Sequence, residues 1–173
     1  MPRVNVELKI PEASTGIPIV WRLGRLYNVV ANIRHARVTS QYGVIGLDLE
    51  GSTDEVNNTV EYLKALKVLD GASALGTVPA APEEAYSNVY TIDVRLSTAF
   101  AAQAASPILA RASRDYRVII NILFASVDEE EGGTLDLTIS GALLEVQRCI
   151  AYLHTTGLRV SPKQRSVSDN GNL

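Results

Sequence analysis

The strongest constraint on the fold is an internal repeat, because the two halves of this 173-residue chain align with each other. Residues 4–10, VNVELKI, match residues 90–96, YTIDVRL, in the order of their apolar, polar, acidic and basic positions. Pro18 then matches Pro107, and Gly51 matches Gly141 after two short insertions. A match of this length within one chain indicates that a single structural unit has been duplicated.

The repeat also predicts how the chain is divided. We expect a first copy at residues 1–70, a linker at 71–88, a second copy at 89–160 and a disordered tail at 161–173. The linker is rich in glycine, proline and small residues, and the tail has almost no apolar residues to bury. Further matched pairs are Tyr27 with Tyr116, Asn32 with Asn121, Leu47 with Leu137, Glu55 with Glu145, and Tyr62 with Tyr152.

Each copy is predicted to contain strand, helix, strand, strand, helix and a short closing strand. Alternation in residues 4–10 indicates a half-buried strand, and a helix is expected to begin near Pro18, with its counterpart near Pro107. Strands follow at about 29–39 and 44–49, and Ser52 with Glu55 has the spacing of a capping box. This order is typical of an α+β, ferredoxin-like fold with an antiparallel sheet and helices on one face.

The second strand of the second copy is unusually apolar. Alternation would place Ile120, Ile122 and Phe124 on one side, and Ile119, Leu123, Ala125 and Val127 on the other. A strand that is apolar on both sides is typically buried on both sides. We therefore expect its sheet to be covered by its own helices and also by the other repeat or a second chain.

Composition excludes several classes of protein. The net charge of −3 argues against a nucleic-acid partner, which usually meets a strongly basic face. No apolar run approaches the ~20 residues of a membrane-spanning helix, and the N-terminus is predicted to be a strand and not a signal peptide. The only cysteine, Cys149, cannot form an intramolecular disulfide, which fits a reducing, cytoplasmic location.

The residues that commonly carry catalysis are scarce. His35 and His154 are the only histidines, and Cys149 falls on a predicted helix, where a buried structural thiol is expected. The acidic run 128–131 is predicted to be a solvated turn, because four adjacent acids cannot converge on one cation. We therefore predict a protein that is not an enzyme and that carries no metal or other cofactor.

The chain resembles the NIL domain family. Asn121-Ile122-Leu123 spells the tripeptide after which these domains are named, and the first copy has Asn32-Ile33 followed by Arg34 in place of leucine. A proline-led helix, hairpin glycines and Tyr152-Leu153 also resemble the family. The resemblance covers residues 3–70 and 89–160.

This resemblance implies an ACT-like, ferredoxin-like fold that commonly pairs. In the ATPase subunit of bacterial methionine importers, such a domain binds methionine at the paired interface and restrains transport. Other members are fused to iron–sulfur modules, and stand-alone versions resemble cyanobacterial proteins. This chain has no G-x-x-x-x-G-K-[ST] phosphate loop and too few cysteines for a cluster, so we expect a free-standing double module.

The resemblance also implies where a ligand would bind. The positions concerned are Asn32, Ile33 and Arg34 in the first copy, and Asn121, Ile122 and Leu123 in the second. An asparagine amide offers donors and an acceptor to the amino and carboxylate groups of a ligand. Alternatively, each asparagine satisfies only nearby backbone groups.

Arginines form a second set of candidates. Arg22 and Arg25 recur as Arg111 and Arg114, where they would contact an anion or a partner, or form a solvated helix face. Arg34, His35 and Arg37 form a basic cluster suited to a carboxylate or phosphate, or to a salt-bridged interface.

Two functions follow from these observations. The first is a regulatory protein that binds a small ligand, with an amino acid such as methionine as first candidate, at a repeat or subunit interface. The second is an interaction module that docks a protein partner through its sheet face or a strand edge, without a small ligand. Self-association within the chain or as a homodimer would fit either function.

Overall fold

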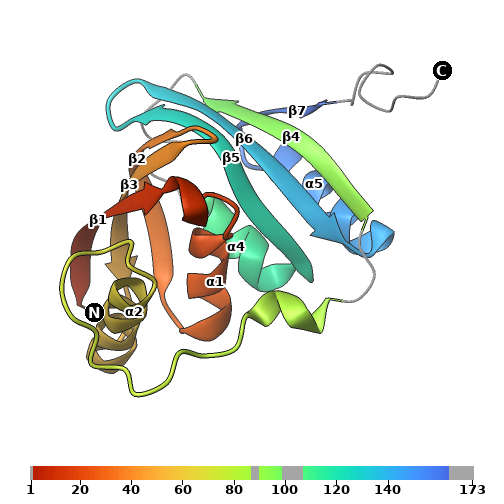
Figure 1. The fold of residues 1–173 in the computed structure, drawn as a ribbon. Coiled ribbons are helices and arrows are strands. Elements are labelled where there is room, and N and C mark those ends of the chain that lie inside the picture. Colours follow the sequence, from red (N-terminus) through yellow and green to blue (C-terminus); the bar gives the residue numbers. More distant parts are fainter. Residues whose placement is uncertain (1, 87–89, 99–106, 164–173) are drawn as a thin grey trace.

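The computed structural model describes residues 2–86, 90–98 and 107–163 (Figure 1). Within these ranges the two copies form one seven-stranded sheet in the order β1-β3-β2-β5-β6-β4-β7, with each described pairing antiparallel. The helices lie under one side of the curved sheet. The predicted α+β class is therefore confirmed.

The first copy follows the predicted order closely. Its elements are β1 (Arg3–Pro11), the short 3-10 helix η1 (Glu12–Ser14), α1 (Ile19–Leu26), β2 (Val30–Val38), β3 (Tyr42–Glu50) and α2 (Thr53–Ala65). Ser52 caps α2 by accepting a hydrogen bond from the Glu55 backbone N–H, as the capping-box spacing predicts. In place of a closing strand, the carbonyl oxygen of Val68 accepts a hydrogen bond from the Lys9 N–H at 2.9 Å.

The second copy contains the complete pattern. After the 3-10 helix η2 (Pro82–Ala85) come β4 (Tyr90–Thr98), α4 (Ile108–Asp115), β5 (Val118–Asp128), β6 (Gly132–Gly141), α5 (Leu143–His154) and β7 (Arg159–Lys163). The spatial order β7-β4-β6-β5 is that of a ferredoxin-like sheet. Strand β7 continues to Lys163, past the expected end of the copy at residue 160, and the rest of the expected tail lies outside the described residues.

The copies meet edge to edge through β2 and β5. Only three residue pairs form this ladder, Ala36 with Val127, Arg37 with Ser126, and Val38 with Ala125. The strands run antiparallel, so each extends beyond the other and leaves part of its edge without a strand neighbour. These two overhanging segments contain the Asn-Ile pairs at 32–33 and 121–122.

A β-bulge interrupts the same place in both strands. The register shifts between Ile33 and His35 in β2, and between Ile122 and Phe124 in β5. Arg34 and Leu123 are thus the extra residues, and the bulge reverses the alternation beyond them. The sequence prediction for β5 is therefore wrong after Ile122, because Ala125 joins Ile122 on the buried face while Phe124 turns to the open face.

The open face of the sheet is uncovered in this chain. Leu123 and Phe124 are 42% and 44% exposed, so the expectation that the other repeat covers this side of β5 is wrong, while cover by a second chain stays a prediction. The other repeat does not cover this face, because the copies join at their edges. The apolar core lies on the opposite face, between the strands and the helices.

The first helix of each copy packs against the other copy. Helix α1 contacts β5, and α4 contacts β2. The two helices approach at the equivalent residues Gly24 and Ser113, where a Cβ built on Gly24 would lie 3.9 Å from the Cβ of Ser113. Trp21, only 1% exposed, donates from its indole Nε1–H to the carbonyl oxygen of Val118 at 2.6 Å.

We predict that Trp21→Phe lowers the free energy of unfolding by about 1–3 kcal/mol, because it leaves a buried carbonyl oxygen without its donor. Urea unfolding followed by far-UV circular dichroism would measure the change. Tyr42→Phe is the control, since Tyr42 is an exposed aromatic, 53% accessible, and should shift the free energy by less than about 0.5 kcal/mol. Equal stability of Trp21→Phe and the parent would contradict a structural role for this hydrogen bond.

Candidate ligand sites at the repeat junction

Two related cavities lie where the first helix of one copy meets the overhanging strand of the other. The larger, about 50 Å³, is lined by Ala31 and Ile33 of β2 together with Pro107, Ile108 and Leu109 at the start of α4. Leu96, Val127 and Leu135 complete its apolar wall. Since one water needs about 10–15 Å³ by this measure, the cavity has room for a small apolar group.

The second cavity is the counterpart of the first. It is about 20 Å³ and is lined by Ile120 and Ile122 of β5 with Pro18, Ile19 and Val20 at the start of α1. Its remaining wall includes Ile10, Val38 and Ile45, of which Val38 and Ile45 occupy the positions of Val127 and Leu135. Ala31 in the first cavity is equivalent to Ile120 in the second. The smaller alanine side chain is consistent with the larger volume of the first cavity.

A polar hollow of about 280 Å³ adjoins the larger cavity. It is lined by Arg3, Val30, Asn32, Asp48, Glu50 and Pro107. Pro107 borders both spaces, so the apolar cavity and the polar hollow lie on either side of the overhanging edge of β2. Asn32 and Asp48 face each other across neighbouring strands, and the Oδ1 atom of each is buried without a hydrogen-bond partner.

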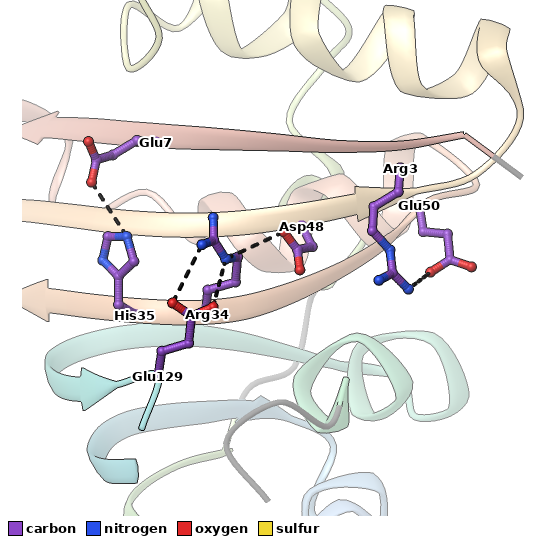
Figure 2. A network of polar contacts seen from close by, with 7 residues as sticks. All are labelled: Arg3, Glu7, Arg34, His35, Asp48, Glu50 and Glu129. Atoms are coloured by element: carbon purple, nitrogen blue, oxygen red, sulfur yellow. Dashed lines mark hydrogen bonds and ion pairs between the residues drawn. The ribbon is translucent and has the colours of Figure 1, made fainter. Parts of the chain in front are cut away.

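Ion pairs surround this hollow on the open face (Figure 2). Arg34, the bulged residue, reaches Glu129 of the other copy at 3.1 Å and Asp48 at 3.6 Å. The hydrogen bond to Glu129 raises the pKa of the Arg34 guanidinium above its ordinary value. Arg3 pairs with Glu50 at 2.9 Å at the outer side of the hollow.

The other members of the basic cluster also have partners. His35 reaches across Gly46 to Glu7, with 3.5 Å between Nε2 and Oε1. A side chain at Gly46 would overlap the imidazole, so this glycine leaves the space that the ring occupies. Arg37 donates a hydrogen bond to the hydroxyl of Ser126 across the junction of the copies.

The helix arginines lie on the helical side of the sheet and contact protein groups. Arg22 is bound by Glu83, with 2.6 Å between its NH2 and Oε2, and this hydrogen bond raises the pKa of Arg22. Arg25 donates to the carbonyl oxygen of Tyr116, and Arg114 donates to that of Val29 at 3.4 Å. Arg111 lies near Tyr152 in the same copy, and none of the four helix arginines lines the described hollows.

The NIL residues are divided between the two faces of the sheet. Ile33 and Ile122 enter the apolar cavities, whereas Asn32 and Asn121 lie on the open face. Arg34 and Leu123 occupy the bulges. In the first copy Asn32 lines the polar hollow, Ile33 lines the apolar cavity on the other face, and Arg34 lines neither of them. In the second copy Asn121 lies beside Thr138.

Sequence reasoning missed Asp48, Glu50 and Pro107 as site residues. The acids alternate with Leu47 and Leu49 on the third strand, which indicates that they share the face opposite the core. Their position beside Asn32 depends on strand pairing and could not be obtained from spacing alone. The ion pair of Arg95 with Asp136, 2.7 Å long on the open face of the second copy, was missed for the same reason.

Other expected features are found as follows. Cys149 is fully buried, as predicted, and burial raises the pKa of its thiol to about 12. In the acidic turn, Asp128 accepts hydrogen bonds from the backbone N–H groups of Glu130 and Glu131, which hold the pKa of its carboxyl below the ordinary value. Among the described residues no cluster of histidine, cysteine or acidic side chains has a metal-binding arrangement.

The described helices are all too short or too polar to cross a bilayer.

The fold and its paired cavities define a tandem ferredoxin-like domain protein with pockets at the junction of its copies. The family model for the NIL domain matches the chain twice, over residues 4–69 and 95–162. The chain therefore belongs to the NIL domain family, and the resemblance noted in the sequence is confirmed.

Two solved structures show a distant likeness to the chain. A microcompartment protein from Desulfitobacterium hafniense DCB is 12% identical with a TM-score of 0.35, over 98% of this chain and 99% of that one. The acetolactate synthase small subunit from Thermotoga maritima is 15% identical with a TM-score of 0.30, over 96% and 100% of the two chains. No curated protein sequence matches the chain.

We predict that Cys149 does not react with a thiol reagent in the folded protein at pH 8, because its thiol is buried and protonated. One equivalent should react after unfolding in urea, as measured with an absorbing disulfide reagent. Leu144→Cys is the control, since Leu144 is 58% exposed and its replacement should react at once in the native state. Rapid native labelling of Cys149 in the parent would show that α5 opens readily.

Proposed function

We propose that this protein is a non-enzymatic regulator that binds a small amino acid at the junction of its two copies. The observation that carries the proposal is the pair of apolar cavities, each built from a helix start in one copy and the Asn-Ile segment of the other. Duplication would preserve such a shared arrangement if both copies once bound a ligand. Membership of the NIL family supports methionine as the first ligand to test.

The strand edges supply groups that an amino acid could use. The ladder between β2 and β5 stops at Ala36, so the backbone of Asn32 and Ile33 has β3 on one edge and none of the described strands on the other. Backbone N–H and C=O groups along such an edge can hydrogen-bond a carboxylate and an amino group. The ligand's side chain would enter the cavity beside Ala31.

Binding at this position would depend on how the two copies pack against each other. The cavity walls come from β2 of one copy and from α4, β4 and β6 of the other, so a ligand would contact both copies at once. A ligand shifts a conformational equilibrium only by its preference for one arrangement. In this proposal the regulated variable is the packing of α4 against β2.

A second candidate function is supported by the open sheet face. Leu123 and Phe124 lie exposed beside each other at the bulge of β5, on a face that no described helix covers. Exposed apolar residues on a sheet face are suited to docking a protein partner. This interaction function would need no small ligand.

We predict that one or more of the twenty common amino acids raises the melting temperature in a thermal-shift assay. At a concentration 100 times the Kd, binding stabilises the native state by about 2.7 kcal/mol, or about 5–10 °C for a chain of this size. Ala31→Ile should remove most of this shift, because it fills the larger cavity with the side chain that the other copy carries at Ile120.

Ala80→Ile is the matched control, since Ala80 is exposed between the copies and its replacement leaves the cavity unchanged. It should retain the ligand-induced shift. The docking function gives a different result, in which a partner is lost on Phe124→Ser and retained in Ala31→Ile. Absence of any shift with all twenty amino acids at millimolar concentration would count against ligand binding.

A further inference from the structure

We propose that the hollow beside Asn32 and Asp48 receives the protonated amino group of the ligand, and that only this one of the two related sites selects an amine. The inference rests on the proposed amino-acid binding at the junction and specifies its chemistry. It assigns a recognition role to Asp48 and a different specificity to each copy.

Two buried acceptors in the hollow have no hydrogen-bond donor among the described residues. The Oδ1 atoms of Asn32 and Asp48 lie on residues that are directly paired across β2 and β3, and each is buried without a hydrogen-bond partner. A buried polar atom is normally satisfied, so two acceptors without a hydrogen bond on paired residues indicate that a donor group belongs beside them. An ammonium group supplies three donors and no acceptor, which fits this arrangement.

The charges around the hollow favour a cation at this position. Arg34, the cation nearest to Asp48, makes its closer contact with Glu129, at 3.1 Å against 3.6 Å to Asp48. Arg3 at the outer side is already paired with Glu50. The buried Oδ1 of Asp48 has only this longer ion pair with Arg34 and no hydrogen-bond partner, so it can accept a charge-assisted hydrogen bond from a ligand.

The hollow and the apolar cavity can hold two ends of one molecule. Pro107 lines both spaces, and the overhanging edge of β2 runs between them with Asn32 on one face and Ile33 on the other. A ligand seated at this edge would direct its ammonium group toward Asn32 and Asp48. Its apolar side chain would enter the cavity beside Ala31.

The other copy lacks acids at the two positions equivalent to Asp48 and Glu50. Asn121 is paired with Thr138, where Asn32 is paired with Asp48, and Ile119 is paired with Ser140, where Val30 is paired with Glu50. The cavity on that side is also the smaller one. The second site therefore offers neutral hydroxyl groups at these two positions, and its acid Asp93 lies on β4 beyond Thr138, one strand further from Asn121 than Asp48 is from Asn32.

Isothermal titration calorimetry with L-leucine and L-methionine, each compared with its desamino analogue, tests the inference. For an amino acid that binds, we expect one ligand per chain and an affinity at least about tenfold higher than that of its analogue, since hydrogen bonds to charged groups are worth this much or more. Asp48→Thr copies the other site and should remove the preference for the amine. Asp48→Asn keeps the size of the side chain and should reduce the preference.

The reciprocal variant Thr138→Asp should raise the stoichiometry to two or introduce a second, weaker amine-dependent event. Melting temperatures confirm that each variant is folded. Binding of the analogue as tightly as the amino acid, or an unchanged preference in folded Asp48→Thr, would overturn the amine site and leave the proposed function standing. If no amino acid binds the parent chain in calorimetry or thermal shift, the proposed function and this inference both fail.

Discussion

The short ladder between β2 and β5 is the constraint on which the two cavities between the copies depend. Because only three residue pairs form the ladder between these strands, each strand extends past its neighbour and leaves its Asn-Ile segment with one edge that no described strand pairs. The first helix of the opposite copy fills the adjacent space, and Trp21 fixes one helix there through its hydrogen bond to Val118. A longer ladder would pair these edges and close both cavities.

The two copies share a backbone plan but differ in the side chains that line their sites. Ala31 makes one cavity larger where Ile120 fills the other, and Asp48 gives one hollow a charge where Thr138 is neutral. Trp21 has no aromatic counterpart, since Ala110 occupies the equivalent position in α4. The pseudo-symmetric framework therefore supports two sites with separate chemistry.

The sequence was sufficient to predict the repeat, the order of elements, the cap at Ser52 and the burial of Cys149, because these depend on local spacing and on comparison of the copies. It was insufficient for the bulges, since nothing beside Arg34 or Leu123 signals an extra residue. The bulge at Leu123 turns Phe124 to the exposed face, whereas simple alternation predicts that Phe124 lies on the same side as Ile122. Asn32 and Asp48 lie opposite each other because of the register between β2 and β3, and this register cannot be read from the sequence of either strand alone.

Covalent fusion of the copies has an evolutionary consequence. In an assembly of two identical subunits, a substitution alters both symmetry-related sites together, so neither can change while the other is conserved. Here one polypeptide contains both halves, which are connected from α2 through η2 to β4. Each half has its own sequence, so a substitution in one leaves the other unchanged. Selection can thus conserve the side chains of one half, while the other half accumulates substitutions and keeps only the residues that support the fold.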